Sequence, residues 1–163
     1  MAQRNFNDIY LGLQDRIYRL AAGIVGGREE AEDLVQDLYE RLWTKRDFVA
    51  GQPNPEGYIL ASARNLSLDL LRKRRPQGEL SPLIAAEGAR PDEGDMEEIV
   101  ARLVAALPEK QRTALRLRDV ECMEMDEIAA VMEMRATAVR MTLSRARGTV
   151  KERLEKIMNF STI

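Results

Sequence analysis

The stretch LPEKQRTALRLRDVECMEMDEIAAVMEMRATAVRMTLSRAR, residues 107–147, decides the fold of the C-terminal half of the chain. It predicts a helix opened by Pro108, a short apolar helix over residues 125–133, a turn, and a second helix rich in arginine. Two short helices at this spacing, the second carrying cations and small polar groups, form a helix-turn-helix that can place one helix in a DNA major groove. We therefore expect a DNA-binding element here.

The last predicted helix, residues 136–157, has an apolar seam and a polar face. Apolar side chains recur every three or four residues, as on the buried face of a helix, at Val139, Leu143, Ala146, Val150, Leu154 and Ile157. Side chains off this seam are candidates to contact base edges, because arginine can bind guanine through two hydrogen bonds. The candidates are Thr137, Arg140, Met141, Ser144 and Arg145, with Arg147 placed for phosphates. The alternative is a solvated basic face on a structural helix.

A second basic helix is predicted upstream, over residues 58–75, after a proline-containing loop over residues 47–57. The polar side chains expected off its apolar seam are Arg64, Asn65, Asp69, Arg72 and Lys73. A loop facing a basic helix can hold unpaired bases, which need pockets and polar edges rather than a groove. The alternative is that Asp69 pairs with a neighbouring cation and the face is solvated, while Asn65 makes a local hydrogen bond.

The net charge of −2 conceals a strong segregation of charge along the chain. Residues 64–75 carry five cations against one carboxylate, and residues 135–156 carry seven against two. Between them, residues 79–98 carry seven carboxylates against one arginine. Because local charge decides where a polyanion binds, the two basic segments are compatible with nucleic acid although the total charge is not basic.

The predicted fold is all-α, with two small helical domains, residues 1–76 and 96–163, joined by a flexible acidic linker over residues 77–95. The helices are predicted over residues 6–25, 28–46, 58–75, 96–107, 108–120, 125–133 and 136–157. The helix over residues 28–46 has an acidic face that DNA would repel, so its expected partner is a protein. The alternative is a solvated helix with Trp43 in the core.

Composition excludes several classes of function. One cysteine, Cys122, rules out an internal disulfide, and a chain without histidine has few ligands for a metal. No apolar run approaches the roughly 20 residues of a membrane helix, and the N-terminus lacks an apolar signal core, so a cytoplasmic protein without membrane insertion is expected. An enzyme acting on nucleic acid is disfavoured for want of a nucleophile with a base. We expect no catalytic residue, metal site, cofactor or small-molecule substrate.

These motifs together resemble the extracytoplasmic-function (ECF) sigma factors of bacterial RNA polymerase. AEDLVQDLYERLW (residues 31–43) followed by YILASARNLSLDLLRKRR (residues 58–75) is similar to the family's second conserved region. LPEKQRTALRLRDVE followed by DEIAAVMEMRATAVRMTLSRAR is similar to its fourth. The chain departs from the family at Cys122, where glycine is frequent, and at Tyr58, where tryptophan is common.

The resemblance implies a non-catalytic subunit that binds the polymerase core enzyme and directs promoter recognition, promoter melting and transcription initiation. Asp33, Gln36 and Asp37 match the positions that bind the clamp helices of the largest polymerase subunit. The loop near Phe48 and the helix carrying Asn65 would capture an unstacked base of the minus-ten element. The last helix would bind the minus-thirty-five element as duplex DNA, and an anti-sigma factor is an expected partner.

A stand-alone helix-turn-helix regulator remains the alternative. Such a protein should dimerise and bind a palindrome on free duplex DNA, because half-site symmetry mirrors protein symmetry. The first half of the chain has no self-complementary apolar heptad. For the sigma-factor interpretation, the linker predicts two domains that are either extended or folded together in the free protein, and a free protein that binds promoter DNA weakly.

Overall fold

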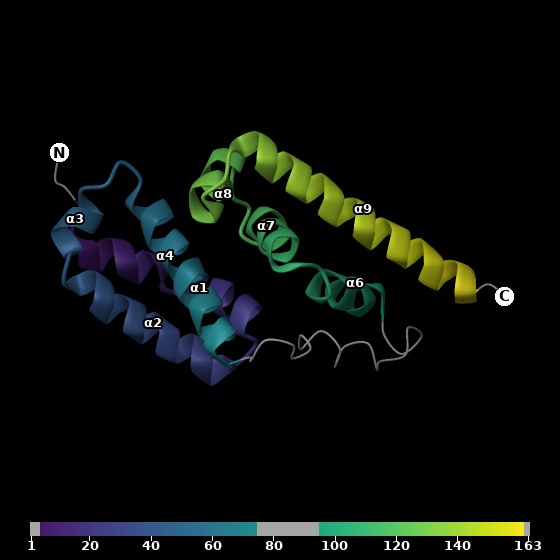
Figure 1. Ribbon diagram of the computed structural model, residues 1–163, viewed down its shortest axis with the longest axis horizontal. Coiled ribbons are helices and arrows are strands. Elements are labelled where there is room, and N and C mark those ends of the chain that lie inside the picture. The colour runs from purple at the N-terminus through teal and green to yellow at the C-terminus, as the bar shows by residue number, and fades with distance from the viewer. Residues whose placement is uncertain (1–3, 75–94, 162–163) are drawn as a thin grey trace.

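The computed structural model describes residues 4–74 and 95–161, and all regular secondary structure in these two ranges is helical (Figure 1). We call the two ranges the N-terminal half and the C-terminal half. The predicted linker, residues 77–95, lies outside the described residues except for Asp95, which caps the next helix by accepting a hydrogen bond from the backbone N–H of Glu98 at 2.9 Å.

The N-terminal half consists of α1 (Phe6–Val25), α2 (Arg28–Trp43), α3 (Arg46–Ala50) and α4 (Pro55–Arg74). α1 starts where the side chain of Asn5 accepts a hydrogen bond from the backbone of Asp8, and it ends at Gly26, whose φ of 81° suits a residue without a Cβ. The predicted bounds of α1 are confirmed. Its apolar stripe packs against both α2 and α4, so α1 is the centre of this half.

Two predicted boundaries in the N-terminal half are wrong. The helix expected over residues 28–46 ends at Trp43, and a separate short helix, α3, follows within the segment expected to be a loop. α4 begins at Pro55 rather than at Tyr58. Proline is well tolerated in the first turn of a helix, because the N–H that it lacks has no intrahelical partner there. The proline that indicated a loop therefore opens a helix.

The C-terminal half consists of α6 (Met96–Ala105), α7 (Glu109–Asp119), α8 (Met125–Met132) and α9 (Ala136–Ser161). Glu124 and Glu127 form a reciprocal capping box at the start of α8, and Glu133 ends α8 in the left-handed conformation at φ 55°. α8 and α9 pack against each other and against α7, which confirms the predicted helix-turn-helix. Along the α9 seam, Val139, Leu143 and Ala146 are buried, while the positions from Val150 onward are only half-buried.

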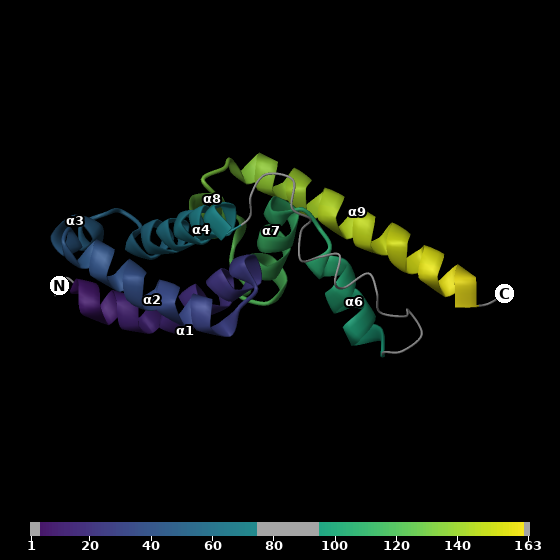
Figure 2. The same cartoon turned by 60° about the horizontal axis from the view of Figure 1, so that its bottom comes forward.

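The two halves share one hydrophobic core. α4 lies against α8, and α1 contacts α7, so residues far apart in sequence form a continuous buried cluster (Figure 2). Gly57 suits the close approach at the start of α4, because a Cβ there would lie 2.5 Å from Nδ2 of Asn54 and 3.1 Å from the Cβ of Ala130 in α8. The sequence predicted two domains that are either extended or folded together, and in the structure they are folded together.

The turn between α7 and α8 contains a strained residue. Cys122 has φ 57°, in the left-handed region that favours glycine, and the turn is closed by a 3.0 Å hydrogen bond from the backbone N–H of Met123 to the carbonyl of Leu117. The glycine that the family often has at this position would occupy the same backbone conformation without a Cβ.

We expect Cys122→Gly to raise the free energy of unfolding by about 0.5–1 kcal/mol, because relief of left-handed strain exceeds the extra chain entropy of glycine. Urea denaturation measures the change. Cys122→Ser keeps a Cβ at the same φ and serves as the control, with an expected change near zero. Stabilisation of both variants by the same amount would contradict the strain argument.

Candidate nucleic-acid interface

The first turns of α9 present an exposed polar face. All six candidate residues of this helix are exposed: Thr137, Arg140, Met141, Ser144, Arg145 and Arg147. Within the described residues, no ion pair joins Arg140 or Arg145 to a carboxylate, so both guanidinium groups can accept an external ligand. Arg147 differs, because its Nη2 lies 3.0 Å from Oδ1 of Asp119 in α7. The face therefore offers two uncompensated cations at the start of the second helix of the helix-turn-helix.

The candidate residues of α4 do not form one exposed face. Asn65, Asp69, Arg72 and Lys73 are exposed, but Arg64 is only 6% exposed. The prediction that Arg64 lies off the buried seam is wrong. It failed because α4 is buried on two sides, by α1 and α2 on one and by α8 on the other. The 3.3 Å contact between Arg72 and Asp69 matches the local pairing that was the alternative for this face.

Arg64 is held by a carboxylate of the other half. Its Nε and Nη2 donate to the two carboxylate oxygens of Glu109, the first residue of α7, at 3.1 and 2.6 Å. The hydroxyl of Thr113 donates to the same carboxylate at 2.6 Å. The two charged side chains are 8% and 20% exposed. A bidentate charged pair shielded from water is strong, and removal of one member leaves the other charge buried at a cost of about 3 kcal/mol or more.

Aromatic rings of α3 and α4 meet beside the loop that joins these two helices. Phe48 in α3 is 57% exposed and meets Tyr58 edge-on, with ring centroids 5.9 Å apart. The Tyr58 hydroxyl accepts a hydrogen bond from Nζ of Lys45 at 2.8 Å, and the same ammonium lies 5.4 Å from the ring centroid. Exposed rings beside a cation form a surface on which an unstacked base can lie. Tyr58, which replaces the family's tryptophan, keeps an aromatic ring at this place.

The acidic face of α2 lies open. Asp33 and Gln36 are exposed and Asp37 is half-buried. The polar contacts of this trio stay within the helix: Asp37 pairs with Arg41 at 3.1 Å, and Gln36 donates to Glu40 at 3.3 Å.

Trp43, at the end of α2, is 39% exposed, so the placement of Trp43 in the core, which was one part of the alternative for this helix, is wrong. Its ring stacks on Tyr39 with centroids 5.8 Å apart, and the Arg46 guanidinium covers it at 4.3 Å from the ring centroid.

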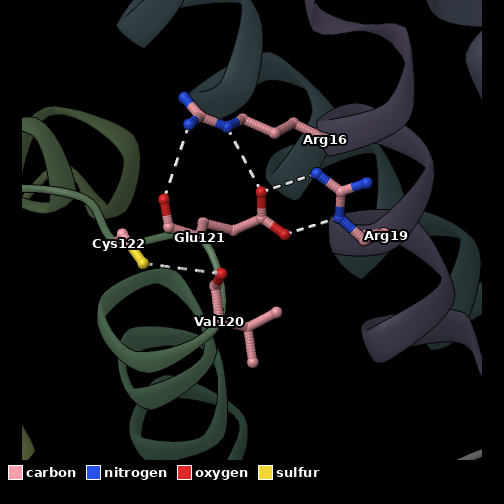
Figure 3. A network of polar contacts seen from close by, with 5 residues as sticks. All are labelled: Arg16, Arg19, Val120, Glu121 and Cys122. Atoms are coloured by element: carbon pink, nitrogen blue, oxygen red, sulfur yellow. Dashed lines mark hydrogen bonds and ion pairs between the residues drawn. The ribbon is translucent and has the colours of Figure 1, made fainter.

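A second set of charged contacts joins the halves through Glu121, in the turn after α7 (Figure 3). Arg19 of α1 donates to both oxygens of this carboxylate, from Nε at 2.6 Å and from Nη2 at 2.8 Å. Arg16 donates from Nε to the carboxylate at 3.2 Å and from Nη2 to the backbone carbonyl of Glu121 at 3.4 Å. Sequence reasoning missed this network, because Glu121 lies more than 100 residues from Arg16 and Arg19 and each member is an ordinary charged residue in its local sequence.

A cavity of about 530 Å³ lies beside this network, between α1, α6 and α7. Its lining is largely apolar, with arginine side chains around it. Burial lowers the pKa of the Arg116 guanidinium, one of these side chains, below its usual range. The guanidinium lies over Gly23 of α1, where an added Cβ would come within 2.3 Å of Nη1. On this side the halves therefore meet at a partly open pocket, beside the core that they share.

Two further features, a metal-binding cluster and a membrane-spanning helix, are absent from the part of the chain that the structure describes. Within residues 4–74 and 95–161, no group of histidine, cysteine, aspartate and glutamate side chains could hold a metal ion. The same residues contain no helix that is long and apolar enough to cross a membrane.

The Glu121 network predicts a dependence of stability on pH. Hydrogen bonds from Arg19 hold the pKa of the Glu121 carboxyl below the ordinary value of 4.5, against the opposing effect of burial. A carboxyl whose pKa is lower in the folded than in the unfolded chain stabilises the fold fully above its unfolded pKa, and this stabilisation is lost as the pH falls through the folded pKa. We expect Glu121→Gln to lose less stability than the wild type as the pH falls below 4.5.

Urea denaturation at a series of pH values from neutral to acid measures this difference. Glu98→Gln is the control, because the Glu98 side chain is exposed and forms a long ion pair, 3.9 Å, with Arg102 of its own helix α6. If the free energy of unfolding falls with decreasing pH equally steeply in Glu121→Gln and Glu98→Gln, Glu121 is not the source of the predicted acid sensitivity.

Comparison with known proteins identifies relatives of both halves. Residues 9–77 match the family described as Sigma-70 region 2, and residues 97–150 match Sigma-70, region 4. The chain is 23% identical to the ECF RNA polymerase sigma factor SigW of Bacillus subtilis, with 95% of this chain and 91% of that protein covered. It is 33% identical to the ECF RNA polymerase sigma factor SigE of Mycolicibacterium smegmatis, with 87% and 58% covered.

A similar solved structure is the sigma factor RpoE in complex with the anti-sigma factor NepR from Bartonella quintana. The two chains share a TM-score of 0.69 at 22% sequence identity, over 92% of this chain and 96% of that one. At this identity the likeness shows the fold alone.

Proposed function

Because the chain belongs to the sigma-70 family of RNA polymerase sigma factors, in its ECF group, we propose that its two halves divide promoter binding between them. The boundaries that we propose are residues 1–76 for region 2, residues 77–95 for the linker and residues 96–163 for region 4. The chain works as a sigma factor: it binds RNA polymerase and directs promoter recognition. The pair of exposed, uncompensated arginines at the start of α9 supports the assignment of this helix to duplex DNA.

For the minus-thirty-five element, we propose that α9 lies in the major groove. Arg140 and Arg145 would each donate two hydrogen bonds to a guanine, and Ser144 and Met141 would contact neighbouring base edges. Thr137, at the N-terminal end of the helix, would contact the backbone or a base. Arg147 would bind a phosphate after it leaves Asp119, since that ion pair is exposed and therefore weak.

For the minus-ten element, we propose that Phe48 and Asn65 hold an unstacked base between the α3–α4 loop and α4. Phe48 offers an exposed ring for stacking, and the Asn65 amide offers both a donor and an acceptor to a base edge. Arg72 and Lys73 lie further along α4, exposed, where they would bind the backbone of the separated strand. Asp69 orients Arg72, and Arg64 joins this surface only when it has been released from Glu109.

For the polymerase, we propose that Asp33, Gln36 and Asp37 on α2 bind the clamp helices of the largest core subunit. Asp33 and Gln36 are exposed and Asp37 is half-buried, and the charge of the trio suits a basic protein partner rather than DNA. The family consists of initiation factors rather than catalysts, and we propose the same for this chain, without cofactor, metal or small-molecule substrate. It would act in the cytoplasm, where polymerase and promoters are, under the control of an anti-sigma factor.

The test is a reconstitution with bacterial core polymerase. Genomic DNA enriched by the complex, but not by core polymerase alone, identifies a promoter, and permanganate footprinting on it reports strand opening. We expect promoter-dependent open complexes, and we expect Asp37→Lys to lower the affinity for core polymerase by reversing a charge on α2. Asp119→Lys makes the same charge reversal outside the α2 face and serves as the control. A chain that forms no complex with core polymerase would refute the proposal.

The assignment of α9 makes a separate prediction. Arg140→Ala and Arg145→Ala should each cost about 1–3 kcal/mol of promoter affinity and relax the preference at one base pair of the minus-thirty-five element. Lys156→Ala, at an exposed cation near the end of the same helix, should weaken binding without changing the preference. Quantitative footprinting on a set of single-base promoter variants measures both effects. An unchanged preference in both arginine variants would remove α9 from base recognition.

A further inference from the structure

The cavity between α1, α6 and α7 has the size and the lining of a small-ligand pocket. Its volume of about 530 Å³ lies within the range of roughly 300–1,000 Å³ that is usual for such pockets. Aliphatic side chains from four helices line it: Leu20, Ala22, Leu60, Val104 and Leu117. Val120, which also lines it, is 64% exposed, so the apolar surface continues from the cavity to the outside of the molecule.

The walls of the cavity carry more positive than negative charge. The described residues that line it include four arginines and one carboxylate, that of Glu121. Arg16 and Arg19 share this carboxylate (Figure 3), and Arg112 donates to backbone carbonyls at and just after the end of α6. The fourth guanidinium, that of Arg116, is not accounted for by these partners.

Arg116 is a half-buried cation at the wall of the cavity. No ion pair or side-chain hydrogen bond joins its guanidinium to another residue within the ranges 4–74 and 95–161. Burial lowers its pKa, and no neighbouring carboxylate opposes this effect. The guanidinium lies over Gly23 of α1, which leaves room for it because glycine has no Cβ. A cation that is withdrawn from water without a counter-ion costs free energy, and an anion that enters the cavity would recover part of that cost.

We propose that this cavity binds an amphipathic monocarboxylate, a molecule with one carboxylate and an apolar chain. The carboxylate would accept two hydrogen bonds from the planar guanidinium of Arg116, and the chain would lie against the aliphatic side chains. One uncompensated guanidinium suits one negative charge. A nucleotide fits poorly, because its phosphates need several free donors and the described lining is largely apolar. The described lining includes none of the residues proposed to bind polymerase or promoter DNA, so the inference does not depend on the proposed function.

The first experiment varies the ligand. The probe is octanoate, added below its micelle concentration to the isotope-labelled full chain at neutral pH. We expect it to shift the amide NMR signals of Gly23, Val104 and Leu117, which line the cavity, with a dissociation constant on the order of 0.1–1 mM. Octan-1-ol has the same chain without the charge, and acetate has the carboxylate without the chain. Each should bind at least about tenfold more weakly than octanoate.

Several outcomes of this titration would overturn the proposal. Equal affinities for octan-1-ol and octanoate would mean that the cavity takes up apolar chains without recognising the anion. Equal affinities for inorganic phosphate and octanoate would mean that the chain is not recognised. If dilution of the ligand-free protein shifts the same amide signals, a second copy of the chain covers the cavity. Octanoate shifts confined to residues outside the lining, or their absence at millimolar octanoate, would remove the site.

The second experiment removes the cation. Arg116→Gln should weaken the binding of octanoate at least about tenfold and change the binding of octan-1-ol by less than about twofold. Lys110→Gln removes the same charge from an exposed position of α7 outside the cavity lining. As the control, it should change the affinity for octanoate by less than about twofold. Circular dichroism and thermal melting establish that both variants are folded.

A third variant displaces the guanidinium and keeps its charge. The Cβ that Gly23→Ala adds would lie 2.3 Å from Nη1 of Arg116, so this flexible side chain has to move. Alanine is favoured over glycine inside a helix, so we expect the variant to fold and to bind octanoate about threefold or more weakly than the wild type. Gly12→Ala adds a Cβ to the same helix with nothing within 4 Å and is the control. Wild-type affinity for octanoate in both Arg116→Gln and Gly23→Ala would overturn the assignment of the carboxylate to Arg116.

Discussion

The ion pair between Arg64 and Glu109 decides how the two halves of this protein are placed. Most of the other contacts between the halves are apolar or partly solvated, and such contacts tolerate sliding and separation. A bidentate charged pair shielded from water fixes both distance and angle, and breaking it without a new partner leaves a buried charge. Any open form of the chain must therefore give the Arg64 guanidinium another anion or expose it to water. The phosphates of a melted promoter strand are such an anion.

Much of the fold follows from periodicity. Apolar residues at intervals of three and four define α1 from its first to its last residue, and capping residues define the start of α8. The helix-turn-helix is recognisable because both of its helices have their apolar seams facing one core. The short helix α3 was not predictable from its sequence, since a helix of five residues has no period to detect and the prolines that follow it, Pro53 and Pro55, indicated a loop.

The candidate site was predicted well where its residues are exposed and poorly where the halves meet. The polar residues at the start of α9 lie on the surface because a helix with a single seam exposes its opposite face. Arg64 does not lie on the surface, because α4 is buried on two faces and the second face is covered by α8, which is distant in sequence. No local pattern identifies the partner of Arg64, nor that of Glu121. Both contacts join ordinary charged residues whose proximity depends on tertiary structure alone.

The charge pairs between the halves, with their arginines in the N-terminal half and their carboxylates in the C-terminal half, have a consequence for synthesis of the chain on the ribosome. Arg64 emerges 45 residues before Glu109, and Arg19 emerges 102 residues before Glu121. The N-terminal helices are thus translated and can begin to fold while their cations still lack the carboxylates that later neutralise them. During that interval Arg16, Arg19 and Arg64 lie near ribosomal and messenger RNA without these carboxylates, although residues 1–76 as a whole are nearly neutral, with 12 cations and 11 carboxylates. Completion of the final helices then supplies internal counter-ions to the N-terminal half.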